Sequence, residues 1–209
     1  MRKLLIVFTF ICILTLPALA DEPVISAESA ILYCTNTRDT VYEKNADEKM
    51  LIASTTKIMT AIVVIENCDL NASVEIKPEW CTVEGSSMYL KAGHSYTVRE
   101  LLEGMMITSG NDAATALAAY TAGSEEKFAA LMNEKASLLG MGNSSFSNPH
   151  GLDDDDHYST ARDMAILADY CMNNGEFRSI VSMKSAAIDG LTYINHNKLL
   201  WQYDGCCGV

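Results

Sequence analysis

The feature that most constrains this chain is a lysine inside an apolar run. The run is Met50–Ile65, MLIASTTKIMTAIVVI, and its composition predicts a buried helix that ends near Asn67. Residues three apart project from the same face of a helix, so the Ser54 hydroxyl and the Lys57 amine can meet. Because apolar surroundings favour the neutral form of an amine, the run predicts a serine nucleophile with a lysine base.

The same spacing occurs a second time, so the pattern alone leaves two interpretations open. Ser124 and Lys127 repeat it beside Glu125 and Glu126, where a helix is expected to begin. There the serine is interpreted as an N-cap, and the glutamates favour the positive end of the helix dipole. The apolar neighbours of Ser54 distinguish the first pair from this second one.

The first 20 residues have the layout of a secretory signal peptide. Arg2 and Lys3 precede an apolar stretch over residues 4–16, and Ala18 and Ala20 form a small-residue cleavage site. The stretch is shorter than the roughly 20 residues of a membrane span. An exported protein is therefore expected. The net charge of −12 argues against nucleic-acid binding and against charge-driven adhesion to anionic lipid.

The rest of the chain alternates extended pieces with helices. Residues 29–35 and 40–44 are β-like runs around a polar turn, which predicts a hairpin. Thr97 and Glu100 form a capping box before a helix that ends at Thr108. Further helices are predicted over residues 112–120, 125–139 and 161–172, the last capped by Ser159 or Thr160.

A polar corner, Ser109-Gly110-Asn111, separates two of these apolar helices. In one interpretation Gly110 ends the first helix and Asn111 or Asp112 caps the second. In the other, Ser109 and Asn111 are turned toward a functional site, because a core would otherwise exclude such groups.

No metal and no cofactor are expected. Residues 146–160 contain His150, His157 and the acidic run 153–156, but their spacing matches no zinc or calcium motif. A solvated acidic loop is the expected structure. The chain has seven cysteines, and all but Cys12 lie beyond the expected signal peptide, without zinc-ribbon spacing. Because an exported protein can contain disulfides, the sequence leaves open whether these cysteines pair.

Several segments occur in the order in which the serine D-alanyl-D-alanine carboxypeptidases carry similar ones. The chain resembles these low-molecular-mass penicillin-binding proteins over nearly all of residues 25–205. The matching segments are ASTTKIMT (53–60), GSSMYLK (85–91), YTVRELL (96–102), TSGNDAA (108–114), NPHGLD (148–153) and YSTARD (158–163).

The resemblance implies an α/β (α+β) fold like that of the β-lactamases and DD-peptidases, with an antiparallel sheet, helices and an all-helical region. It implies that Ser54 attacks the terminal D-Ala-D-Ala bond of a peptidoglycan pentapeptide and that Lys57 takes the serine proton. Ser109 would relay a proton to the leaving D-alanine, and Asn111 would hold the substrate. β-Lactams would act as inhibitors of such an enzyme, located in the cell envelope.

The family's third motif, Lys-Thr-Gly, does not occur in the sequence. In relatives it follows a segment like NKLLWQY (197–203), so residues 21–209 are expected to be an incomplete catalytic domain. The remaining sheet strands and the C-terminal segment with which many relatives contact a membrane would then be missing. The loss of one oxyanion donor typically lowers a rate by about two to three orders of magnitude.

Three alternatives remain beside the carboxypeptidase. The chain could be an inactive fragment or a non-catalytic protein that binds peptidoglycan or β-lactams, which the absent Lys-Thr-Gly favours. A serine β-lactamase shares Ser-x-x-Lys but usually has Ser-Asp-Asn in place of Ser109-Gly110-Asn111. A metallopeptidase centred on His150 and His157 is the most remote.

Overall fold

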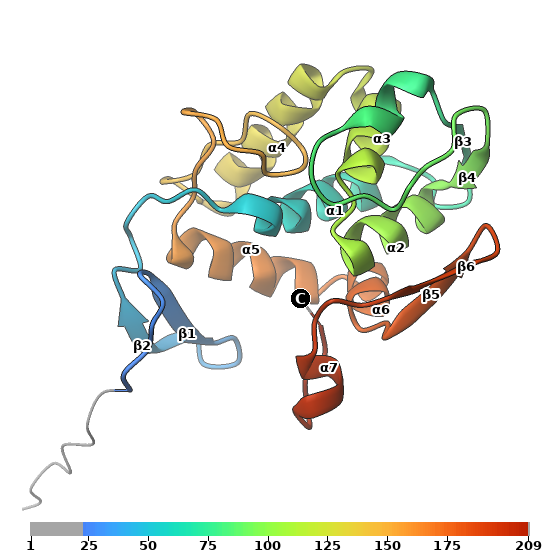
Figure 1. Ribbon diagram of the computed structural model, residues 1–209. Helices are drawn as coiled ribbons and strands as arrows, with labels where there is room; N and C mark the ends of the chain where they lie inside the picture. Colours follow the sequence, from blue (N-terminus) through green and yellow to red (C-terminus); the bar gives the residue numbers. More distant parts are fainter. Residues whose placement is uncertain (1–22, 209) are drawn as a thin grey trace, which may run out of the picture.

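The computed structural model describes residues 23–208 (Figure 1). The expected signal peptide over residues 1–20 lies outside this range. The helices are α1 (Thr56–Asn67), α2 (Val98–Thr108), α3 (Asn111–Ala122), α4 (Glu125–Leu139), α5 (Ala161–Met172), α6 (Gly175–Val181) and α7 (Leu199–Gln202), with 3-10 turns η1 (Ala53–Thr55) and η2 (Pro78–Thr82). The strands are β1 (Ala30–Cys34), β2 (Asp39–Lys44), β3 (Ser73–Glu75), β4 (Ser95–Thr97), β5 (Ser185–Ile188) and β6 (Leu191–Ile194).

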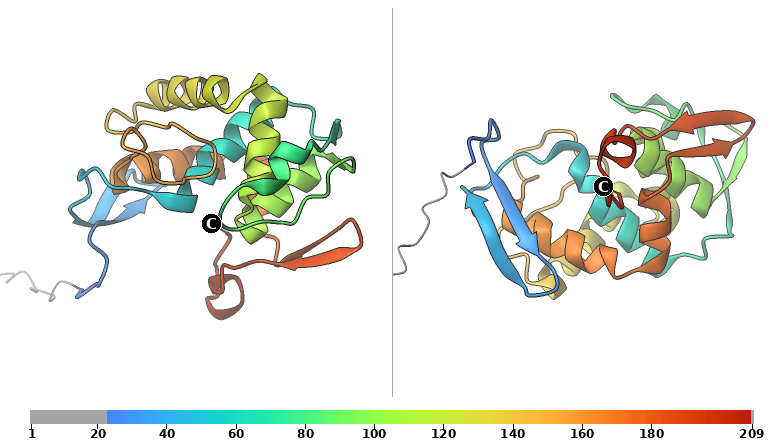
Figure 2. Two further views of the ribbon diagram at one scale, coloured as in Figure 1. Left: turned by 45° about the horizontal axis from the view of Figure 1, so that its top comes forward. Right: turned by 90° about the horizontal axis from the view of Figure 1, so that it is seen from below.

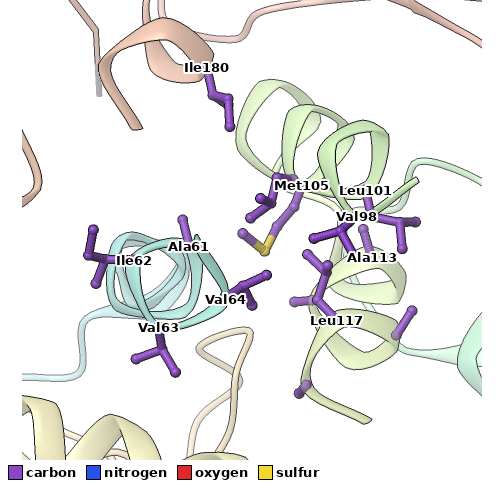
Figure 3. Close-up of a cluster of buried hydrophobic side chains, with 14 of the residues drawn as sticks. Ala61, Ile62, Val63, Val64, Val98, Leu101, Met105, Ala113, Leu117 and Ile180 are labelled. Carbon is purple, nitrogen blue, oxygen red and sulfur yellow. The ribbon is translucent and has the colours of Figure 1, made fainter. Parts of the chain in front are cut away.

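Helix α1 is the centre of the molecule (Figure 1). Every residue from Thr56 to Val64 is buried, as expected of a helix that is apolar on all sides. Helices α2, α3, α4, α5 and α6 all pack against it. Figure 3 shows Ala61 and Val64 of α1 close to Met105 of α2 and Leu117 of α3, in the interior of the bundle. The core is therefore built around the helix that follows Ser54.

The caps expected from sequence are present. The Thr97 hydroxyl accepts from the Glu100 backbone N–H, and the Glu100 carboxylate accepts from the Thr97 N–H, which confirms the capping box that opens α2. Ser124 accepts from the Lys127 N–H and caps α4. At α5 the cap is Thr160, whose side chain accepts from the Asp163 N–H. Each of these helices therefore begins where the sequence predicted, at a polar residue that precedes a segment with helical apolar periodicity.

The mixed α/β class is confirmed, but the expected single sheet is not formed within residues 23–208. The described strands form three separate antiparallel pairs, β1–β2, β3–β4 and β5–β6. The β1–β2 hairpin lies on α5, whereas β5–β6 lies on α2, so helices keep the two hairpins apart. Both views of Figure 2 show them at opposite ends of the molecule.

The β1–β2 hairpin is fastened to the bundle by Arg162 at the start of α5. Its guanidinium donates to Glu43 at 2.6 Å and to Asp47 at 2.7 Å, and its backbone N–H donates to Ala46 O. Because an isolated two-stranded sheet is only marginally stable in water, these contacts help to stabilise the hairpin. Within residues 23–208, no helix has the length and apolarity that crossing a membrane requires. The cysteines of this range are all free thiols.

Truncation of a core side chain should show how strongly the fold depends on this bundle. Leu101 of α2 is fully buried, so Leu101→Ala should lower the free energy of unfolding by about 2–5 kcal/mol, because it removes apolar contact and leaves a cavity. Leu138→Ala is the matched control, since Leu138 of α4 is 74% exposed and its loss should cost under about 0.5 kcal/mol. Urea unfolding of the two variants makes the comparison. Equal losses would contradict the assignment of α2 to the core.

Candidate active site

Ser54 lies in the 3-10 turn η1, directly before the buried helix α1. The residue before it, Ala53, has a φ of 44°, a left-handed conformation that costs energy for a residue with a Cβ. Gly151 approaches this turn so closely that a Cβ on it would lie 1.9 Å from the Ala53 oxygen. The turn therefore holds Ser54 at the surface while α1 enters the core.

Lys57 is the buried partner of Ser54. Only 2% of Lys57 is exposed, and its amine is surrounded by three oxygen atoms. The Lys57 Nζ lies 3.1 Å from Ser54 Oγ, 2.7 Å from Asn111 Oδ1 and 2.7 Å from the His150 carbonyl oxygen. Burial lowers the pKa of Lys57 to about 8, and the charge of Asp112 opposes this shift. With a pKa of about 8, roughly a tenth of this amine is neutral at pH 7, far more than for an ordinary lysine.

Asn111 is fixed at the start of α3 by backbone groups of a neighbouring segment. Its side-chain Nδ2 donates to the Glu84 carbonyl at 2.6 Å, and its backbone N–H donates to the Ser86 carbonyl at 2.7 Å. The amide nitrogen therefore faces Glu84, and the amide oxygen faces Lys57. Ser54, Lys57 and Asn111 thus form one connected hydrogen-bond group.

Ser109 lies beside this group without being bonded to it. Its φ of 59° is left-handed, and Ser109, not Gly110, is the residue that ends α2. Gly110 is the N-cap residue of α3 and provides no side-chain cap, so the purely structural interpretation of this corner was wrong in detail. The Asn111 amide is instead bonded to Lys57 and Glu84. Among the described residues, the buried Ser109 Oγ has no hydrogen-bond partner. Ser109 lines a cavity together with Ser54 and Lys57.

The segment 144–160 fixes the other side of Lys57, which the sequence did not reveal. The Thr56 hydroxyl lies 2.7 Å from His157 Nε2, and the Thr60 hydroxyl donates to the Pro149 carbonyl at 2.6 Å. Because His157 Nδ1 accepts from the Ser147 N–H, Nε2 carries the proton and donates to Thr56. The available signal was that residues 56, 57 and 60 are the polar positions within the buried part of α1, residues 56–64.

The histidines of this segment have structural partners. Burial lowers the pKa of His150 to about 4, with the Lys57 charge acting in the same direction, so this imidazole is neutral at physiological pH. His157 is engaged by Thr56 and Ser147, and Asp153–Asp156 are exposed. Within residues 23–208, no group of three His, Cys, Asp or Glu residues is placed to hold a metal ion.

Two cavities meet at Ser54. One, of about 240 Å³, is lined by Ser54, Lys57 and Ser109 together with apolar residues of α2 and the segment 195–197. The other, of about 640 Å³, is lined by Ser54, Asn111, and the segments 84–86 and 150–153. An extended ligand could therefore pass over the Ser54 hydroxyl and occupy both sides of it.

Comparisons with known proteins agree on one family. Residues 17–208 match Peptidase S11, described as D-alanyl-D-alanine carboxypeptidase. The chain is 38% identical to the carboxypeptidase DacF of Bacillus subtilis over 88% of its own length and 50% of that protein's. It is 40% identical to DacC of Escherichia coli, covering 87% of this chain and 48% of the relative. The chain thus spans about half the length of these curated relatives.

Solved structures match the fold. A D-alanyl-D-alanine carboxypeptidase from Mycobacterium tuberculosis superposes with a TM-score of 0.84 at 31% identity, over 89% of this chain and 72% of the other. Penicillin-binding protein 5 from Haemophilus influenzae gives 0.83 at 32% identity, over 88% and 56%. Sequence and structure together therefore place this chain in the Peptidase S11 family of D-alanyl-D-alanine carboxypeptidases.

Proposed function

We propose that the protein is a serine-type D-Ala-D-Ala carboxypeptidase that removes the terminal D-alanine from peptidoglycan stem peptides. The observation that carries the proposal is the buried Lys57 amine, 3.1 Å from an exposed serine hydroxyl. A lysine in such a site is expensive to bury, and its depressed pKa equips it as a base. The Ser54 hydroxyl beside it is the nucleophile.

The reaction proceeds in two balanced steps. Ser54 Oγ forms a bond to the carbonyl carbon of the penultimate D-alanine while its proton passes to the neutral Lys57 amine. The C–N bond to the terminal D-alanine then breaks, and the proton passes through the Ser109 hydroxyl to the leaving amine. Water next attacks the ester on Ser54. One of its protons passes by way of Lys57 to the departing Ser54 oxygen and restores the hydroxyl, and the shortened peptide leaves as a carboxylate while the second proton passes to solvent.

The surroundings of Ser54 suit this chemistry. Ser54 lies at the positive end of α1, where the helix dipole would stabilise the negative charge that develops on the substrate oxygen. The unpartnered Ser109 Oγ lines the smaller cavity, on the side we assign to the leaving D-alanine. Asn111 lines the larger cavity, on the side we assign to the acyl part of the stem peptide.

The proposal extends to location and inhibition. Residues 1–20 would direct export, so the enzyme would act on the cell wall outside the cytoplasm, with residues 21–209 as part of its catalytic domain. β-Lactams would acylate Ser54 in place of the D-Ala-D-Ala peptide. Metals and other cofactors have no role in this scheme.

Covalent labelling tests the nucleophile. In the protein as the organism makes it, fluorescent penicillin should attach to the peptide that contains Ser54, and Ser54→Ala should abolish the adduct because the attacking oxygen is gone. Mass spectrometry of the digested protein locates the label. Ser124→Ala is the matched control from the second Ser-x-x-Lys: loss of the α4 cap should cost about 1 kcal/mol and leave labelling intact.

The same experiment separates the alternatives. A label that persists in Ser54→Ala would refute the mechanism. A stable penicillin adduct without release of D-alanine from a D-Ala-D-Ala peptide would favour a non-catalytic binding protein. Rapid hydrolysis of penicillin without an accumulated adduct would favour a β-lactamase.

The rate of acylation should depend on the charge of Lys57. Below a pH of about 8 the amine is mostly protonated and cannot accept the Ser54 proton, so the rate should rise with pH through a midpoint near 8. Stopped-flow measurement of penicillin acylation between pH 5 and pH 10 gives the profile. His150, with its pKa lowered to about 4, should add no step in this range. A flat profile would exclude Lys57 as the base.

A further inference from the structure

Asp112 is a buried carboxylate directly after Asn111, and no step of the proposed reaction uses it. Only 1% of the residue is exposed. Its Oδ1 accepts from the Met88 N–H at 3.0 Å and from the Ala113 N–H at 2.9 Å. Its Oδ2 accepts from the Ser87 hydroxyl at 2.6 Å and from the Leu90 N–H at 3.0 Å. Four donors thus surround a side chain that, when ionised, can only accept.

Three of these donors belong to residues 84–90, which we call the 84–90 segment. The same segment supplies the Glu84 and Ser86 carbonyls to which Asn111 donates. Two successive residues of α3 therefore bind the same segment in complementary ways. Asn111 donates hydrogen bonds to it, and Asp112 accepts hydrogen bonds from it.

The 84–90 segment packs tightly against the start of α3. A Cβ on Gly110 would lie 3.0 Å from Asp112 Oδ1 and 3.1 Å from the Met88 N–H nitrogen, so the segment approaches the start of α3 as closely as a glycine permits. The segment is also held by the Tyr193 hydroxyl of β6, which donates to the Met88 carbonyl, and by the Met88 and Leu90 side chains, which are buried in the core. Asp112 thus provides three of the bonds that keep the segment against α3.

We infer that Asp112 is a positioning residue: its carboxylate holds the 84–90 segment, so that the Ser86 carbonyl fixes the Asn111 backbone and the Glu84 carbonyl orients the Asn111 side-chain amide toward Lys57. The inference rests on the proposed function, because orientation of Asn111 matters only if Lys57 acts on Ser54. Loss of the Asp112 carboxylate would let the segment move away. Asn111 would then lose the partners that fix which of its atoms faces the lysine.

The Asp112 charge faces few other ionisable groups. Burial raises the pKa of the Cys81 thiol in η2 and of the Tyr193 hydroxyl on β6, and the Asp112 charge acts in the same direction on both. The charge also supports the protonated form of Lys57 on α1, whose pKa burial lowers. An Asp112→Asn variant removes the charge and one acceptor oxygen. With its amide NH2 in the place of Oδ2, it would face the Leu90 N–H, donor against donor. Its effect on the rate needs to be separated from its effect on stability.

A double-mutant cycle makes that separation. Asp112→Asn should lower the penicillin acylation rate constant about 10- to 100-fold at the plateau of the pH profile, the size expected when a catalytic group is misplaced by about 1 Å. In an Asn111→Ala background the same change should cost less than about twofold, because Asp112 acts through Asn111. If the fold-loss in acylation rate of the double variant equals the product of the two single-variant losses, the inference is overturned.

Asp163→Asn is the matched control. Asp163 is also a buried aspartate in the first turn of a helix, α5, and it also accepts from a backbone N–H and a serine hydroxyl, those of Asn143 and Ser144. Among the hydrogen bonds of residues 23–208, none joins Asp163 to Asn111. Its loss should lower stability as much as Asp112→Asn does and change the acylation rate less than about twofold.

A readout that needs no activity distinguishes this inference from the proposed function. Hydrogen exchange of the Asn111 side-chain NH2, followed by NMR, should be at least about tenfold faster in Asp112→Asn than in the unaltered protein or in Asp163→Asn. Unchanged protection would overturn the inference even if Ser54 is acylated. If Asp112→Asn does not fold, Ser87→Ala removes one donor of the Asp112 group and should give the same effect in smaller measure.

Discussion

The arrangement of this site depends on one costly interaction, the burial of the Lys57 amine at the start of an apolar helix. An isolated ammonium in such a place would cost several kcal/mol, so the surroundings must supply acceptors or the amine must give up its proton. Both happen here: three oxygen atoms lie within hydrogen-bond distance, and the pKa falls to about 8. The proposed role of Lys57 as a base and the folding cost of the site both follow from this burial.

The three acceptors of Lys57 come from three different parts of the fold. Ser54 is in the turn before α1, Asn111 is at the start of α3, and His150 is in the segment 144–160, which Thr56 and Thr60 fasten to α1. Each is held in turn by contacts of its own, including the close approach of Gly151 to Ala53 and the bonds of Asn111 and Asp112 to the 84–90 segment. The hydrophobic contacts between α1, α2 and α3 (Figure 3) fix the relative positions of the helices whose first residues form the site.

Much of the local structure could be predicted because its causes are local. The bounds of α4 and α5 and the caps at Thr97, Ser124 and Thr160 follow from polar residues before periodic apolar ones. The contact of Ser54 and Lys57 follows from their spacing. The partners of Thr56, Asn111 and Asp112 could not be predicted, because carbonyl and N–H groups of distant segments have no residue signature. The arrangement of the hairpins also escaped prediction, since pairing depends on which helices lie between strands.

The sequence by itself determined that a lysine would be buried three residues after a serine, and it determined the family resemblance through short segments in a characteristic order. Only the tertiary structure decided what surrounds that lysine. Its His150 partner lies 93 residues away in the chain and contributes a backbone carbonyl, which any residue type could offer. Asn111 and Asp112 are adjacent in sequence, yet Asn111 bonds to Lys57 and Asp112 does not, because successive residues of α3 project about 100° apart around the helix axis. Side-chain spacing specifies local pairs, whereas the folded core specifies which distant backbone groups complete them.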